Sequence, residues 1–195
     1  AMQEVVTRSV DPDGGGVQDM TLFCFDSYGL FTTTVEAKVT PTGNGAGLTG
    51  NFEAEVPENT RTVHFLANQN MSEFKEDKFR NKSEAEVMAL LEGSSGRMIY
   101  WARFTCDPDN DSKIDAQMAD KGNTIKMIRN HAQVSIDNPI NGWIEVTGFV
   151  AYNTNAFGTV APYHPEKGFD FEWPGEDDPF VTLPQNDARM SDITD

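Results

Sequence analysis

Apolar and polar residues alternate with a period of two through much of the chain, as they do in β-strands that have one face in a core. The alternation is clearest in the sequence Phe-Glu-Ala-Glu-Val at residues 52–56. The same pattern predicts further strands at residues 17–25, 33–40, 62–67, 97–106, 124–136 and 143–152. Turns rich in glycine, asparagine and aspartate separate these segments, which is typical of antiparallel connections.

A helix is predicted in the connection at residues 83–91. Ser83 is a suitable N-cap, and Glu86, three residues later, completes a capping box. Val87, Leu90 and Leu91 form the apolar stripe of this helix. A second short helix is predicted near residues 72–77. About seven antiparallel strands with one or two short inserted helices indicate a mainly-β fold, an antiparallel β-sandwich.

The alternation stops near residue 160, and beyond it prolines and acidic residues recur. We expect residues 1–160 to form the β-sandwich domain. Residues 161–195 are expected to be an extended, acidic, proline-rich segment that packs on this domain or leads to a C-terminal one. Four aromatic residues favour packing of this segment: Phe169, Phe171, Trp173 and Phe180.

The charge of the chain narrows the classes of partner. Its 195 residues include 15 Lys and Arg against 31 Asp and Glu, a formal net charge of −16. Such a chain repels the phosphate backbone of nucleic acids. No apolar run approaches the roughly 20 residues that cross a bilayer. We expect neither a nucleic-acid partner nor a membrane span.

The chain offers few patterns typical of catalysis. Residues 45–50 spell G-x-G-x-x-G, but they lead into a strand instead of opening a helix, so we expect a hairpin loop and no nucleotide site. His64, His131 and His164 have no partner at the spacing of zinc ligands. No G-x-S-x-G sequence is present. We predict that the protein is not an enzyme and needs no cofactor.

The acidic segment at residues 107–115 is a candidate calcium site. Asp107, Asp109, Asp111 and Asp115 stand at positions 1, 3, 5 and 9 of the calcium-loop pattern, where oxygen ligands suit a hard cation. Position 6 is a serine instead of the turn glycine, and position 12 is Met118 instead of a bidentate acid. The alternative is an acidic loop that links two strands.

Two cysteines are too few for a disulfide framework and too far apart in sequence for a metal site. Cys24 and Cys106 are predicted to be small apolar side chains in strands, and a disulfide between them is the alternative.

Several segments together resemble the N-terminal domain of the Bacteroidales fimbrillin family. In chain order they are QEVVTRS at residues 3–9, MTLFCFDSYG at 20–29, VPENTRTVHFLAN at 56–68, IRNHAQVS at 128–135 and GFVAYNTNAFGTVAPY at 148–163. Gln133 stands where a lysine is common in the family. Family members usually carry a second sandwich domain, so we expect this chain to correspond to the first one.

The resemblance implies a transthyretin-like sandwich and a structural or adhesive subunit of a fimbria, a lipoprotein attached to the outer membrane or an extracellular fibre subunit. In the family, an Arg-specific protease cuts after the first strand, which leaves and is replaced by a strand of the next subunit. By resemblance, Arg8 is the cleavage site, with an ordinary surface arginine as the alternative. The exchanged strand comprises Gln3, Glu4, Val5, Val6 and Thr7.

An edge strand is the expected template for such donor-strand exchange, because main-chain hydrogen bonds supply affinity and alternate side chains fill pockets. The expected partners are other fimbrial subunits, together with a receptor on a host or bacterial surface. A second interpretation is a surface carbohydrate-binding module, in which Trp143, Tyr163 or Trp173 would form an exposed platform for a sugar ring.

Overall fold

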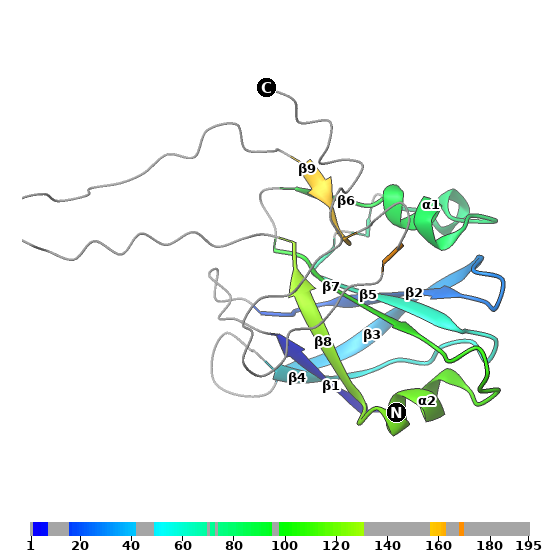
Figure 1. The fold of residues 1–195 in the computed structure, drawn as a ribbon. Helices are drawn as coiled ribbons and strands as arrows, with labels where there is room; N and C mark the ends of the chain where they lie inside the picture. Colours follow the sequence, from blue (N-terminus) through cyan, green and yellow to red (C-terminus); the bar gives the residue numbers. More distant parts are fainter. Residues whose placement is uncertain are drawn as a thin grey trace, which may run out of the picture.

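The computed structural model describes residues 2–7, 16–41, 49–69, 71–72, 74–94, 98–130, 157–162 and 168–169. These ranges hold mostly strands, with two short α-helices and one 3-10 turn (Figure 1). In chain order the elements are β1 (Met2–Thr7), β2 (Met20–Phe25), β3 (Phe31–Pro41), β4 (Thr49–Glu53), β5 (Thr62–Ala67), η1 (Glu76–Lys78), α1 (Glu84–Ala89), β6 (Glu92–Ser94), β7 (Tyr100–Thr105), α2 (Ile114–Asp120), β8 (Thr124–Arg129) and β9 (Phe157–Thr159). The predicted mainly-β class is confirmed.

Seven of these strands form one closed sheet in the order β1, β4, β3, β2, β5, β7, β8. Neighbouring strands are antiparallel except β1 and β8, which are parallel. Because β1 pairs with both β4 and β8, the described strands curl into a ring, and two separate facing layers are not confirmed. The short strands β6 and β9 form a second sheet of their own.

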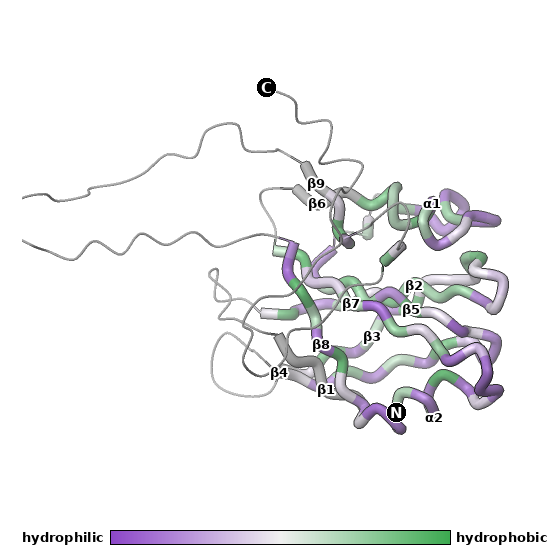
Figure 2. Tube along the Cα trace, viewed as in Figure 1, coloured by the Kyte–Doolittle hydropathy of each residue, from purple (hydrophilic) through white to green (hydrophobic). Residues whose placement is uncertain are grey.

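Strands β2 and β5 are buried along their whole length, because both faces of the sheet are covered there. The side chains facing the interior of the ring include Leu22, Cys24, Val63, Phe65, Ala102, Phe104, Ile125 and Met127. The outer face is covered by α1 and by segments near β9, and this second core includes Phe23, Phe25, Leu66, Trp101, Phe79, Val87, Leu91, Val160 and Phe169. Hydropathy along the trace shows β8 alternating between apolar and polar positions (Figure 2).

The helix predicted at residues 83–91 is confirmed as α1. Ser83 caps it, with its Oγ accepting a hydrogen bond from the Glu86 backbone N–H at 3.4 Å and its own N–H donating to Glu86 Oε2 at 2.8 Å. Val87 and Leu91 are buried, as predicted, whereas Leu90, the C-cap residue, is 41% exposed. The predicted second helix corresponds only to the single 3-10 turn η1.

Several segments depart from the sequence interpretation. Helix α2 was not predicted, because its residues follow an acidic loop and carry only a short apolar stripe, Ile114 and Met118. Strand β8 is described to Arg129, so the rest of the predicted strand at 124–136 and the strand at 143–152 lie outside the described residues. Within the described ranges, no helix is long and apolar enough to cross a membrane.

The start of the predicted C-terminal segment packs on the ring. Val160 and Ala161 are buried, and Phe169 is only 7% exposed in the outer core. The other three aromatic residues of the segment, Phe171, Trp173 and Phe180, lie outside the described residues.

Candidate functional site

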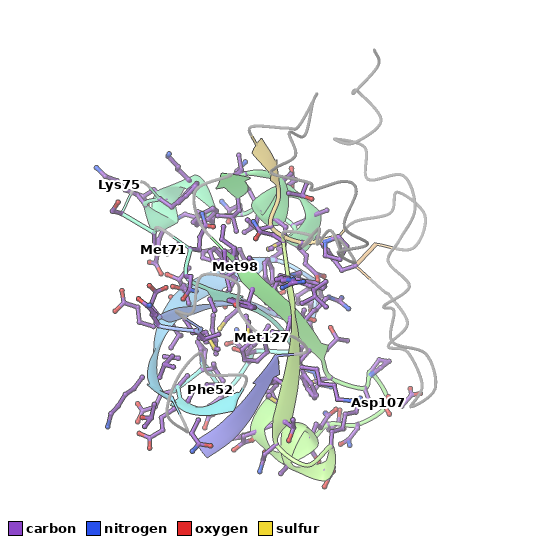
Figure 3. All side chains as sticks on the ribbon, turned by 90° about the vertical axis from the view of Figure 1, so that its left-hand side faces the viewer. Phe52, Met71, Lys75, Met98, Asp107 and Met127 are labelled. Carbon is purple, nitrogen blue, oxygen red and sulfur yellow. The ribbon has the colours of Figure 1, made fainter. Side chains whose placement is uncertain are left out.

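The predicted exchange strand is present as β1, but it is not an edge strand. On one side it pairs with β4 in antiparallel register, from Met2 opposite Glu53 to Val6 opposite Thr49. On the other side it pairs with β8 in parallel register, from Glu4 opposite Thr124 onward. Figure 3 shows β1 lying between these two neighbours. The expectation of an edge strand is therefore wrong.

The neighbours of β1 provide an apolar lining for the slot that it fills. Positions 3, 5 and 7 of the chain lie opposite Phe52, Ile125 and Met127, respectively. All three of these neighbours are buried, at 3%, 6% and 1% exposure. Phe52 and Met127 lie on either side of β1 in Figure 3. The slot thus combines two strand edges with a buried apolar lining.

The predicted cleavage residue and the predicted sugar platform lie outside the described part of the chain. Arg8 and the aromatic residues Trp143, Tyr163 and Trp173 lie outside the described residues, as do His131 and His164.

The predicted hairpin after β3 agrees with the antiparallel pairing of β3 and β4, and Gly50 of the G-x-G-x-x-G sequence lies in strand β4.

A cavity of about 290 Å³ opens at the end of the ring where β1 starts. It lies between the segment that follows β4 and helix α2; in Figure 1, α2 lies near the start of β1. Its apolar lining comprises Leu22, Phe52, Ala54, Val56, Pro57, Val63, Phe65, Ile114 and Met118. Its charged lining residues are Glu55, Glu58, Lys113 and Asp115.

One ion pair links the two sides of this cavity. Lys113 Nζ lies 2.6 Å from Glu58 Oε1, and both side chains are mostly exposed. The hydrogen bond from Lys113 lowers the pKa of the Glu58 carboxyl, and the same bond raises the pKa of the Lys113 ammonium. Because both groups are exposed to water, this pair contributes little to stability.

The acidic loop at residues 107–115 is organised by Arg61 and Gln117. The Arg61 guanidinium donates to three backbone carbonyls, those of Asp107 at 2.9 Å, Asn110 at 2.7 Å and Ser112 at 3.0 Å. The Gln117 amide nitrogen donates to the last two of these carbonyls at 2.9 Å each, and its oxygen accepts from the Asp107 backbone N–H. The Arg61 guanidinium thus holds the loop through its backbone carbonyls.

The four predicted calcium ligands do not converge. Asp107 Oδ1 accepts the backbone N–H of Asp109, and Asp115 Oδ1 accepts the N–H of Ala116 in the first turn of α2. Asp109 and Asp111 are exposed on the loop. Among the residues described, no three His, Cys, Asp or Glu side chains gather so that they could hold a metal ion.

A buried polar network around His64, which sequence reasoning missed, fastens α1 to the outer face of the sheet. The Trp101 Nε1–H donates to His64 Nδ1 at 2.9 Å, and His64 Nε2 lies 2.6 Å from Glu84 Oε1. The Arg103 Nη2 donates to Glu84 Oε2 at 3.2 Å, and Arg103 Nε donates to Oε1. The ring of Phe169 meets the His64 ring edge-on, with centroids 4.7 Å apart.

The geometry of the network sets its protonation. An indole nitrogen only donates, so His64 Nδ1 carries no proton, and the neutral imidazole donates from Nε2 to Glu84. Burial lowers the pKa of His64, against the opposing effect of the Glu84 carboxylate. Burial raises the pKa of Glu84, but hydrogen bonds from His64 and Arg103 outweigh it and lower this pKa to about 2. The carboxylate also lies in the first turn of α1, where a negative charge is favoured.

This network stabilises the fold and does not present a catalytic base. His64 is fully buried, and both of its ring nitrogens are engaged. The sequence gave one weak indication that His64 is buried. The strand alternation at residues 62–67 puts His64 on the same face as Leu66. Its partners Glu84 and Arg103 belong to a helix and to another strand, so nothing local in the sequence pairs them.

The two cysteines are buried and unpaired, so the alternative of a disulfide between them is not formed. Cys24 is in β2, and Cys106 follows β7, with β5 between these strands. Two strand spacings put the backbones about 9–10 Å apart, beyond the reach of a disulfide. Burial raises the pKa of Cys24 to about 11 and also raises that of Cys106.

Comparison of the chain with protein-family models, with curated proteins and with solved structures finds no match.

Proposed function

We propose that the protein is a structural or adhesive subunit of a bacterial cell-surface fimbria, assembled by removal of β1 and donor-strand exchange. The observation that supports this proposal is the position of β1. It is the first strand in the described chain order, and it bridges the two ends of a run of six antiparallel strands, β4, β3, β2, β5, β7 and β8.

Loss of β1 would leave those six strands paired with one another. It would also expose two facing strand edges, β4 and β8, each with unpaired backbone N–H and C=O groups above a buried apolar lining. An extended segment from another subunit would restore both ladders at once. A slot between two edges therefore supports strand exchange better than the single edge expected from the sequence.

The remaining parts of the proposal depend on the family resemblance. They are cleavage after Arg8, a location on the outer membrane or in an extracellular fibre, attachment as a lipoprotein, and a receptor on a host or bacterial surface. The high negative charge of −16 is compatible with a surface protein but does not distinguish it from others.

The proposal is tested by treating the full-length protein with an Arg-specific protease. We expect a cut after Arg8, followed by a ladder of oligomers on a non-boiled gel and in size-exclusion chromatography. Arg8→Lys is the matched control, since it keeps the charge but resists the protease, and it should stay monomeric. Cleavage without oligomers, or oligomers of the same size from Arg8→Lys, would overturn the proposal.

A further inference from the structure

The cavity at the end of the ring continues the slot of β1. The pairing of β1 with β4 ends at Met2 opposite Glu53, the last residue of β4. The next two residues on the β4 side, Ala54 and Glu55, line the cavity, and helix α2 forms its other side. An extended segment that fills the slot and runs past the position of Met2 therefore enters this cavity.

The register of the β1–β4 pairing predicts which residues lie opposite each position of such a segment. Continued by one residue, the antiparallel pairing sets the position before Met2 opposite Ala54, and the position before that opposite Glu55. Phe52 faces the core, and Ala54 packs against the same core two residues later, so the position opposite Ala54 faces inward. The position opposite Glu55 faces outward, where Glu55 is exposed.

The size and lining of the cavity limit its occupant. At about 290 Å³ it is at the lower limit of pockets that take drug-sized molecules. Ala54 is the smallest side chain of the apolar lining and leaves space beside Ile114 and Met118. One large aliphatic side chain fits this space, and its burial is favourable.

The charges around the cavity favour a basic neighbour for that side chain. Three carboxylates, those of Glu55, Glu58 and Asp115, line it against the single ammonium of Lys113. Lys113 is engaged with Glu58. A cation opposite Glu55 would form a cross-strand pair with it, whereas an acid there would be repelled.

We propose that this cavity is the anchor site for an extended segment of a second polypeptide that fills the β1 slot, and that this segment carries a large aliphatic residue opposite Ala54, preceded by a basic residue opposite Glu55. The inference rests on the proposed function, and it adds the chemistry of the partner segment. The anchor residue sets the register of the incoming strand, because a shift by one residue would turn the aliphatic side chain outward.

The test uses the full chain cut after Arg8 and three fluorescent peptides that share the slot sequence MQEVVT. They are KLMQEVVT, KGMQEVVT without the aliphatic side chain, and ELMQEVVT with the charge reversed. We expect KLMQEVVT to bind about 10- to 100-fold more tightly than KGMQEVVT in a competition assay. ELMQEVVT should bind less tightly than KLMQEVVT, with a difference that shrinks in high salt.

Two variants of the protein assign these differences to the cavity. Ala54→Phe fills the space and should remove the advantage of KLMQEVVT over KGMQEVVT. Glu55→Lys, a surface change that leaves the core intact, should reverse the preference between KLMQEVVT and ELMQEVVT. Equal affinities for all three peptides would overturn the anchor site alone. If no peptide displaces the cleaved strand, the proposed function fails and the anchor site with it.

Discussion

Replacing Glu84 by glutamine removes one negative charge from the network that holds α1 against the sheet. The carboxylate accepts hydrogen bonds from His64 and Arg103, and only 19% of its side chain is exposed. Glutamine has nearly the same shape but only one acceptor oxygen. Its amide nitrogen is a donor and would face the N–H groups of His64 and Arg103, which also donate. The Arg103 charge then loses its partner in a half-buried setting.

The pKa of Glu84 gives the magnitude of the loss. The pKa of this carboxyl is about 2 in the folded protein against an ordinary 4.5, which corresponds to about 3 kcal/mol of stability at neutral pH. Because the folded pKa is the lower one, this stability is fully present above pH 4.5 and is lost as the pH falls toward 2. At pH 3 less than half of this stability remains.

The assay is urea unfolding of the wild-type and Glu84→Gln proteins at several pH values between 7 and 3. We expect the variant to be less stable by about 3 kcal/mol at pH 7, a fall in Tm of about 6–12 °C, and the gap to narrow by more than half at pH 3. Asp77→Asn is the control, since it removes the same charge from an ion pair that is 74% and 79% exposed. A gap no larger than that of the control, or one that does not narrow with pH, would refute the assignment.

Three further outcomes follow from the structure. Phe169→Ala should lower the free energy of unfolding by about 3 kcal/mol, because the ring packs on His64 and Trp101. The control Tyr28→Ala, at a side chain that is 87% exposed, should change this free energy little. Replacing a chelator with millimolar calcium should leave Tm unchanged within about 1 °C, because Arg61 already donates hydrogen bonds to the loop carbonyls. A rise in Tm of several degrees would contradict this expectation. Cys24 should react with Ellman's reagent only after unfolding, because its thiol is buried and its pKa is raised to about 11. Rapid labelling of this thiol in the native protein would contradict the prediction and would show that the sheet opens.

Local patterns in the sequence were enough to predict most of the elements. The strand at residues 62–67 has the predicted bounds, and the capping box of Ser83 and Glu86 lies where the sequence places it. Such signals succeed because alternation and capping depend on residues within a few positions of each other. Helix α2 escaped prediction because it is seven residues long and Asp115 in its first turn also matched the calcium-loop pattern.

The candidate sites could be predicted only in part. The segment that becomes β1 was identified from its motif, but its place between β4 and β8 was not. The aspartates of the acidic loop match part of a calcium-loop pattern, with an acidic linking loop as the alternative, and the pattern gave no sign that Arg61, far away in sequence, holds the loop through its carbonyls. A side chain from a distant segment of the chain leaves no trace in the spacing of the loop residues.

The sequence by itself determined the mainly-β class, the positions of most strands and the cap of α1, because these depend on short-range periodicity and backbone hydrogen bonding. Only the tertiary structure decided that the sheet closes, since the parallel pairing of Glu4 with Thr124 joins two segments with no local relation. The same holds for the contacts among His64, Glu84 and Arg103, which exist because the outer face of the sheet and α1 meet in space.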